Sequence, residues 1–360
     1  MSAAEAIAAV LAGPTAPRGA VAGVATRMGR DTAAGGLADL AGTPVTTDTA
    51  FDLASVTKVA ATTTAILRLV SRGDLRFDDP VDRFVPGTAC APGTTVRHLL
   101  LHRAGLWEWQ PLYLDGTNAD GAAAADALPL RYGVDEGRHY SDLGFLILGR
   151  IIAAATGLPL DAAVRELVTA PLGLTRTGYG PVPGPVASST GDGDAAERRM
   201  VATGTPYPIL TSRRHFPWRE GEITGVVNDG NCFHALHGVS GHAGLFGTVD
   251  ELLTLGVALA APESHPELWD PALVAELFRD GPDPGQALGW RSDTVTADGR
   301  PTRVLWHPGY TGCALGVVPA TGTAVVLLAN RLFADEIAPT ETLWRAALPA
   351  LLDPEGTSTP

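Results

Sequence analysis

The sequence predicts an α+β protein whose antiparallel sheet is built from both ends of the chain, with a mostly helical segment inserted between them. Strand-like segments lie near the N-terminus and in the last third, whereas the intervening sequence has helical periodicity. With 360 residues, 45% of them hydrophobic, the chain can bury one large core or two smaller ones. We therefore expect two lobes, sheet and helical, with a functional cleft between them.

The first elements place one serine at the start of a helix. After an N-terminal helix, residues 19–28 (GAVAGVATRM) are expected to form a strand, followed by a glycine-rich turn at residues 35–36. Apolar residues recurring at helical spacing from Val59 predict a helix that Gly73 ends. Ser55 would lie at or just before its N-terminus, where unpaired N–H groups favour a developing negative charge.

The middle of the chain is expected to be helical until about residue 180. Helices are predicted over residues 95–106 and 142–156. Residues 181–231 are read as an irregular loop too long for an ordinary connector, which leaves two interpretations: a substrate-facing excursion, or a surface loop of no special role. Its candidates for lining a pocket are Arg213, Arg214, Phe216 and Trp218.

The last third is expected to supply most of the sheet. Strands are predicted over residues 285–296 and 303–306, then a hairpin over 312–318 and 323–329. A closing helix at about 341–352 would pack on that sheet. We interpret residues 1–360 as one catalytic domain, with lobe A formed by residues 1–56 plus about 240–360, and lobe B by about 57–239.

Composition excludes several classes of partner. The chain has 26 basic and 39 acidic residues and a net charge of −13, so nucleic acid and anionic membranes are not expected partners. The sequence contains no uninterrupted run of 18 or more apolar residues, so we expect no membrane-spanning helix. The N-terminus has an acid where a signal peptide carries positive charge, and three cysteines form no metal spacing. We expect a cytoplasmic protein without cofactor or metal.

The single lysine of the chain marks the most informative motif. Lys58 lies three residues after Ser55, and on a helix this spacing places the two side chains on one face, about 5–6 Å apart at Cβ. An amine can take a proton from a hydroxyl, whereas a guanidinium stays protonated. The alternative interpretation is a capping serine beside an exposed lysine.

Two further stretches could complete the chemistry of an activated serine. Attack on a carbonyl requires N–H donors for the oxyanion and a proton for the leaving group. Tyr140 precedes a predicted helix, from which its phenol could project into a cleft. Gly309, in the stretch Trp306-His307-Pro308-Gly309-Tyr310, would let a substrate approach the backbone of a strand.

Together these motifs resemble the serine β-lactamase and penicillin-binding protein superfamily, in its class C and esterase-like branch, over residues 46–331. The Ser-x-x-Lys motif matches residues 55–58, Tyr-x-Asn matches Tyr140-Ser141-Asp142, and Lys-Thr-Gly matches His307-Pro308-Gly309. HLLLHRAGL at residues 98–106 and GVSGHAGLFGT at 238–248 also resemble segments of this branch. The resemblance implies a β-lactamase-like fold.

The resemblance also implies roles. Ser55 would be the nucleophile, and Lys58 would assist its deprotonation. Tyr140 would be the general base of acylation and return the proton to the leaving group, which requires positive charge near the phenol from Lys58 and, if protonated, His307. The oxyanion hole would be the backbone N–H groups of Ser55 and Tyr310. Supporting or substrate-binding positions would be Asp142, Trp306, His307 and Gly309.

Two departures from the family motifs modify this picture. Asp142 replaces a neutral amide, and a carboxylate near Lys58 would hold the lysine protonated, which leaves Tyr140 as the base. His307 replaces a permanent cation, so recognition of a substrate carboxylate should weaken at neutral pH. Both changes point away from antibiotic hydrolysis.

The motifs and the resemblance lead to three hypotheses for the function of the protein. The first is a serine acyl-transferring enzyme that forms a Ser55 acyl-enzyme from a small-molecule ester or activated amide, then passes the acyl group to an amine or alcohol, as in small-molecule biosynthesis, or to water. The second is a β-lactamase or D-Ala-D-Ala carboxypeptidase. The third is a non-catalytic binding module on the same fold. No oligomeric state is predicted.

His98 and His102 have the i, i+4 spacing of zinc ligands, but no glutamate follows His98 and three leucines separate the pair. We therefore interpret both as core histidines with hydrogen-bond partners.

Overall fold

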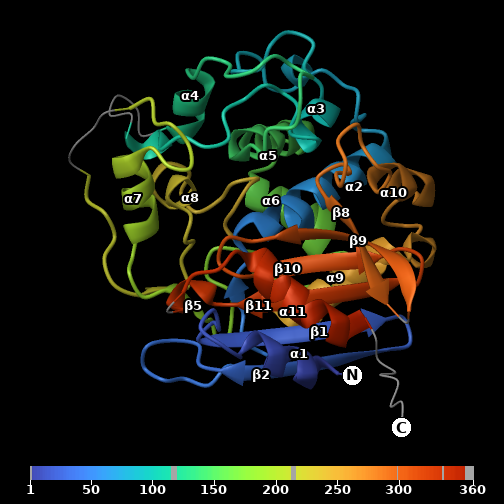
Figure 1. The fold of residues 1–360 in the computed structure, drawn as a ribbon. Coiled ribbons are helices and arrows are strands. Elements are labelled where there is room, and N and C mark those ends of the chain that lie inside the picture. Colours follow the sequence, from blue (N-terminus) through green and yellow to red (C-terminus); the bar gives the residue numbers. More distant parts are fainter. Residues whose placement is uncertain (1, 115–119, 212–215, 298, 335, 353–360) are drawn as a thin grey trace.

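A six-stranded antiparallel sheet forms the base of the molecule (Figure 1). The computed structural model describes residues 2–114, 120–211, 216–297, 299–334 and 336–352. The strand order is β2-β1-β11-β10-β9-β8. The bounds are β1 Gly19–Thr26, β2 Gly29–Gly36, β8 Arg291–Ala297, β9 Arg300–Pro308, β10 Ala314–Val318 and β11 Thr323–Ala329.

Both ends of the chain contribute to this sheet, as the sequence predicts. Strand β1 pairs with β11 in a register that sets Ala20 opposite Ala329. All seven residues of β11 are buried, and burial on both faces explains why its sequence reads as a continuous apolar run. The glycine-rich turn predicted at residues 35–36 is wrong: these glycines end β2, and the hairpin turns at residues 27–28 instead.

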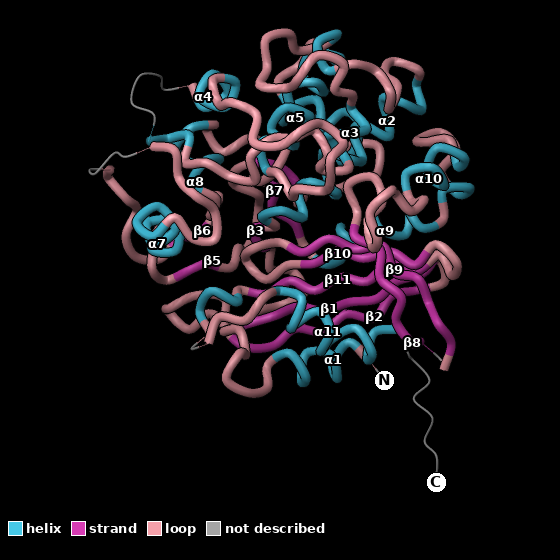
Figure 2. Tube along the Cα trace, turned by 45° about the horizontal axis from the view of Figure 1, so that its top comes forward, coloured by secondary structure: helices cyan, strands magenta, loops and turns pink. Residues whose placement is uncertain are grey.

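Helices cover both faces of the sheet (Figures 1 and 2). Helix α9 (Val249–Ala260) packs against β1, β10 and β11 on one face. The opposite face is covered by α1 (Ala3–Val10) and α11 (Thr340–Leu352), which pack against each other. On that face the rings of Trp306 and Trp344 stack with centroids 5.3 Å apart.

The helical lobe lies beyond the β10–β9–β8 side of the sheet (Figure 1). Its elements include a π-helical segment Lys58–Thr63, α2 Thr64–Arg72, α3 Val96–Leu100, α4 Gly121–Asp126, α5 Asp142–Thr156, α6 Leu160–Val164, a second π-helical segment Arg165–Thr169 and α10 Pro271–Leu277. Gly73 and Gly157 adopt the left-handed conformation that ends α2 and α5, as glycine permits.

The helix predicted over residues 95–106 is shorter than expected. Helix α3 ends at Leu100, and His102 adopts a positive φ of 58° that no right-handed helix can contain. At this point the chain makes tertiary contacts instead, since His102 Nδ1 accepts the Ser141 N–H at 3.0 Å and the His102 carbonyl oxygen accepts the His139 N–H at 2.8 Å.

Residues 181–231 are more ordered than predicted. They contain β5 Ser188–Thr190, α7 Ala195–Thr203 and β6 Ile223–Thr224, and they lead into α8 Gly230–Ala235. A separate small sheet joins β3 Phe51–Asp52, β7 Leu245–Gly247 and β4 Gly178–Tyr179. In the described ranges no single helix is long and apolar enough to cross a membrane. Helix α5 and the helical residues 160–169 together have sufficient length and apolar composition, but the two segments are bent by 76° relative to each other.

Candidate active site

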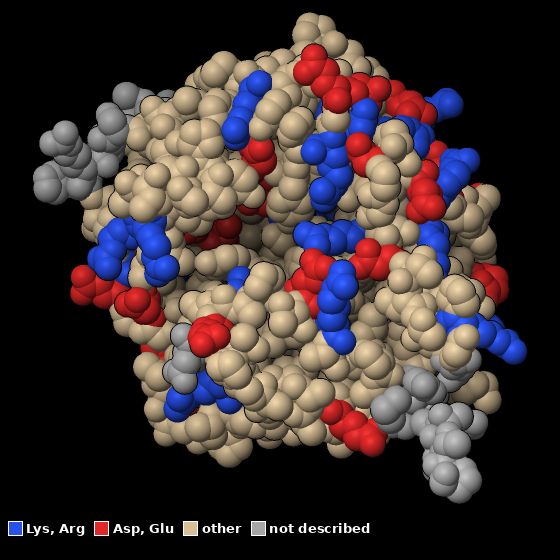
Figure 3. Space-filling view, in the orientation of Figure 1, with Lys and Arg blue, Asp and Glu red and all other residues tan. Residues whose placement is uncertain are grey.

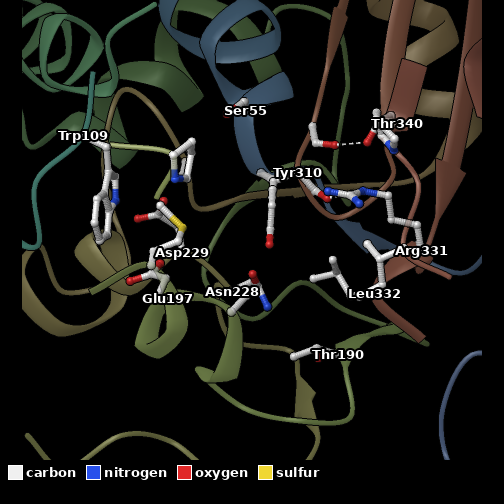
Figure 4. Close-up of a pocket in the computed structure, with 18 of the residues that line it drawn as sticks. Ser55, Trp109, Thr190, Glu197, Asn228, Asp229, Tyr310, Arg331, Leu332 and Thr340 are labelled. Atoms are coloured by element: carbon white, nitrogen blue, oxygen red, sulfur yellow. Dashed lines mark hydrogen bonds between the residues drawn. The ribbon is translucent and has the colours of Figure 1, made fainter. Parts of the chain in front are cut away.

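A cavity of about 900 Å³ opens between the sheet and the helical lobe, and Ser55 forms part of its wall. Figure 3 shows the hollow near the centre of this face, with acidic side chains inside it. The walls come from several regions far apart in sequence, which include Trp109, Glu197, Asp229, Tyr310 and Arg331 (Figure 4). Tyr140 also lines the cavity. The volume suits a small-molecule substrate.

The backbone around Ser55 is strained. Ala54 has a φ of 44°, a conformation that residues other than glycine rarely adopt and that is characteristic of functional sites. The buried Asp52 carboxylate holds this turn, because it accepts the Ala54 N–H at 2.9 Å and the Asn228 N–H at 2.6 Å. Burial raises the pKa of Asp52 to about 6. The turn directs Ser55 toward the cavity at the start of the helix.

Lys58 is fully buried and satisfies three acceptors. Its Nζ lies 2.9 Å from Ser55 Oγ, 2.7 Å from Asp142 Oδ1 and 3.3 Å from the His242 carbonyl oxygen. Burial lowers the pKa of Lys58, but Asp142 and Tyr140 outweigh it and raise this pKa overall. The ammonium thus donates to Ser55 Oγ and to the His242 carbonyl oxygen while its charge pairs with Asp142.

Tyr140 lies on the cavity wall between two cations. Its ring centroid is 5.0 Å from Lys58 Nζ and 5.9 Å from the Arg138 guanidinium carbon. Arg138 Nε is buried and makes no hydrogen bond among the described residues. Two positively charged side chains therefore lie beside the Tyr140 ring.

Burial disfavours the protonated form of His307 that a second cation beside Tyr140 would require. Burial, together with the charges of Lys58, Arg291 and Arg138, lowers the pKa of His307 well below its ordinary value. The neutral ring lies 6.0 Å from the Tyr140 ring, and its Nδ1–H is placed to donate to the Pro308 carbonyl oxygen at 2.8 Å. The second cation beside Tyr140 is therefore Arg138, not His307.

The two backbone N–H groups expected to form the oxyanion hole are both unengaged. Among the described residues, neither the Ser55 N–H nor the Tyr310 N–H donates a hydrogen bond. A Cβ at Gly309 would collide with the carbonyl oxygen of Leu53. The absence of a side chain at Gly309 therefore lets the end of β9 approach the turn that carries Ser55. The sequence alone predicts only the approach of a substrate at this glycine.

Trp306, expected at the substrate site, does not line the cavity that contains Ser55. The indole is buried on the opposite face of the sheet, stacked on Trp344, and its Nε1–H donates to Asp293 at 2.8 Å. Successive residues of a strand point to opposite faces, so Trp306 and His307 diverge.

The segment 181–231 does contribute to the cavity. Thr190, Glu197 and Asp229 are among its lining residues. Phe216 and Trp218 instead pack around Tyr113, outside the lining, and Arg213 and Arg214 lie outside the described residues.

Several residues that line the cavity belong to no sequence motif from which their position could have been predicted. Glu197 Oε2 accepts a hydrogen bond from the Tyr113 hydroxyl, and Oε1 accepts the Gly230 N–H, each at 2.6 Å. Burial and the charge of Asp229 raise the pKa of Glu197 to about 8. Asp229 itself stays ionised, because His242 outweighs burial and lowers the Asp229 pKa.

The histidines of the zinc-like spacing have protein partners, but only His102 is buried, so the interpretation of His98 as a core residue is wrong. His98 Nδ1 lies 3.1 Å from the Thr95 backbone nitrogen and caps α3, while His102 accepts from Ser141. Among the described residues, no group of three or more metal-ligating side chains is assembled.

Comparison with known proteins identifies relatives across almost the whole chain. The family model described as Beta-lactamase matches residues 7–348. An Escherichia coli K12 protein named "Putative D-alanyl-D-alanine carboxypeptidase" is 30% identical over 319 residues, covering 79% of this chain and 70% of that protein.

Solved structures share the fold. The structure of SurE with D-Leu has a TM-score of 0.70 and 25% identity, covering 99% of this chain and 75% of that one. EstCE1, described as a hydrolase with promiscuous acyltransferase activity, has a TM-score of 0.68 and 23% identity, covering 96% of this chain and 98% of that one. The latter likeness concerns the fold alone.

Proposed function

The chain belongs to the beta-lactamase family, and from this premise we propose that it is a serine enzyme which forms an acyl-enzyme on Ser55 from a small-molecule ester or activated amide. The acyl group then passes to an amine or alcohol, or to water. The observation that carries the proposal is the 2.9 Å contact between Ser55 Oγ and a buried lysine, inside a cavity sized for a small molecule.

The geometry supports separate roles in acylation for the nucleophile, the general base and the oxyanion hole. Ser55 Oγ attacks the substrate carbonyl while its proton passes to the Tyr140 oxygen, the proposed general base, whose ring lies near Lys58 and Arg138. The oxyanion accepts hydrogen bonds from the N–H groups of Ser55 and Tyr310. Tyr140 then returns the proton to the leaving group as the carbonyl re-forms, and the acceptor repeats these steps in deacylation.

The cavity wall favours a substrate with an amino group. Asp229 Oδ1 pairs with His242 Nε2 and accepts the Cys232 N–H, whereas Asp229 Oδ2 makes no hydrogen bond among the described residues. Both oxygens of Glu197 already accept hydrogen bonds, so Asp229 Oδ2 is the acceptor that a substrate could use. An amine, as acceptor or as part of the donor, would find a hydrogen-bond acceptor there. We therefore place transfer to an amine ahead of transfer to an alcohol.

A D-Ala-D-Ala carboxypeptidase is the second candidate, and the name of the Escherichia coli relative supports it equally. Its substrate ends in a carboxylate. The neutral His307 at the third motif offers that carboxylate no charge, so such a substrate would depend on cations elsewhere, such as Arg331 on the cavity wall.

Intact-mass measurement tests the proposal. The protein is mixed with p-nitrophenyl esters of increasing acyl length, with and without an amine acceptor, and in parallel with a D-Ala-D-Ala peptide and a chromogenic cephalosporin. We expect acyl mass on wild type and none on Ser55→Ala, with faster loss of the acyl group when amine is present. Rapid release of D-Ala would instead favour the carboxypeptidase. Absence of acyl mass from every donor on folded protein would contradict both.

A further inference from the structure

We propose that Thr340 is a positioning residue for the oxyanion hole, because its hydroxyl fixes the peptide unit that carries the Tyr310 N–H. The inference rests on the proposed acyl-enzyme function and adds a residue from the C-terminal helix α11, far from the three motifs in sequence. None of the family motifs contains it.

The contact is direct. The Thr340 hydroxyl donates to the Gly309 carbonyl oxygen at 2.7 Å, shown as the dashed line in Figure 4. Thr340 is 5% exposed and also belongs to the cavity lining. A buried hydroxyl bonded to a backbone carbonyl holds that carbonyl in one orientation.

The consequence follows from peptide geometry. The carbonyl of Gly309 and the N–H of Tyr310 belong to one planar trans peptide and point in opposite directions. The Gly309 carbonyl oxygen also accepts the Gly312 N–H at 3.2 Å, so the Thr340 hydroxyl adds the shorter of two hydrogen bonds that hold this carbonyl on one side. The Tyr310 N–H is directed to the other side, where it remains without an acceptor among the described residues. The hydrogen bond to the carbonyl also polarises the peptide and strengthens the N–H as a donor.

The flanking groups support the same orientation. Arg331 Nε donates to the Tyr310 carbonyl oxygen at 2.6 Å, so the next peptide unit is fixed as well. The Gly309 N–H donates to the Cys313 carbonyl oxygen at 2.6 Å. The Gly309 N–H and the carbonyls of Gly309 and Tyr310 are thus paired, whereas the Tyr310 N–H donates no hydrogen bond to the residues that the structure describes.

Two variants of Thr340 separate positioning from packing. Thr340→Val keeps the shape but loses the hydroxyl, whereas Thr340→Ser keeps the hydroxyl. We expect the acylation rate of Thr340→Val with a p-nitrophenyl ester to fall by about tenfold to hundredfold, less than the loss of a whole oxyanion donor. Thr340→Ser should stay within about threefold of wild type.

Thr94→Val is the matched control. Thr94 is fully buried and its hydroxyl donates to the Ala91 carbonyl oxygen, also at 2.7 Å, but it does not line the cavity. We expect Thr94→Val to lower thermal stability and leave the acylation rate unchanged.

A readout specific to the tetrahedral state completes the test. Phenylboronic acid forms a tetrahedral adduct on the serine oxygen, and we expect its affinity for Thr340→Val to fall in parallel with the acylation rate. Ester binding, measured in the Ser55→Ala background, should not change. Acylation of Thr340→Val at the wild-type rate would overturn the inference, as would equal losses in Thr340→Val and Thr340→Ser that track stability. If wild type itself acquires no acyl group, the proposed function fails first.

Discussion

Lys58 Nζ lies 2.7 Å from Asp142 Oδ1, and this ion pair determines how the lysine can act. The lysine side chain is fully buried, while that of Asp142 is 18% exposed on the cavity wall. The carboxylate replaces the amide of the family motif and keeps the ammonium charged. Within the proposed function, Lys58 therefore acts through its charge beside Ser55, and Tyr140 is the proposed base.

Replacing Asp142 with asparagine should destabilise the protein at neutral pH by about 3 kcal/mol, because it leaves a buried cation without its counter-charge. Because Asp142 raises the pKa of Lys58 in the folded state, this stabilisation is present at neutral pH and fades only when pH rises above the ordinary lysine range. Urea unfolding measures the loss. Asp74→Asn, which breaks an exposed pair with Arg72, is the control, with an expected loss under about 1 kcal/mol.

Lys58→Arg should nearly abolish acylation although it keeps the charge. The site around Lys58 is closed, and a planar guanidinium cannot reach the three acceptors of a compact ammonium. The acylation rate, followed by intact mass, measures the effect. A near-normal rate would mean that only positive charge is needed at this position.

Tyr140→Phe should slow acylation by about 10²–10⁴-fold, since it removes the proposed base but keeps the ring. The rate of acyl mass gain on Ser55 is the measurement. Tyr132→Phe is a suitable control, because the Tyr132 hydroxyl donates to Glu108 at 2.8 Å and Tyr132 is not a lining residue. A loss within a few-fold for Tyr140→Phe would assign proton transfer to another group.

Glu197→Gln should flatten the pH dependence of stability. The pKa of Glu197 is raised from 4.5 to about 8 in the folded protein, so its stabilising contribution is complete below 4.5 and is lost as pH rises through about 8. Glutamine does not titrate and can still pair with Tyr113 and Gly230. Urea unfolding between about pH 5 and pH 8 should show a smaller decline for the variant than for wild type. Equal declines would show that Glu197 does not titrate in this range.

Much of the sheet and the two-part architecture could be predicted because their signals are local. Continuous apolar runs such as residues 323–329 indicate buried strands, and the ends of α2 and α5 coincide with glycines. The helix expected to residue 106 could not be delimited, since at His102 the chain makes tertiary contacts instead. The order within 181–231 likewise depends on contacts outside the segment.

The sequence by itself determined the spacing of Ser55 and Lys58 and the identity of the three motif segments, because these depend on neighbours within one turn or one strand. Only the tertiary structure decided the environment of those residues. It placed Arg138 rather than a charged His307 beside Tyr140, and it turned Trp306 into the core. Charge depends on burial and on neighbours that folding brings together, and strand alternation directs adjacent side chains to opposite faces.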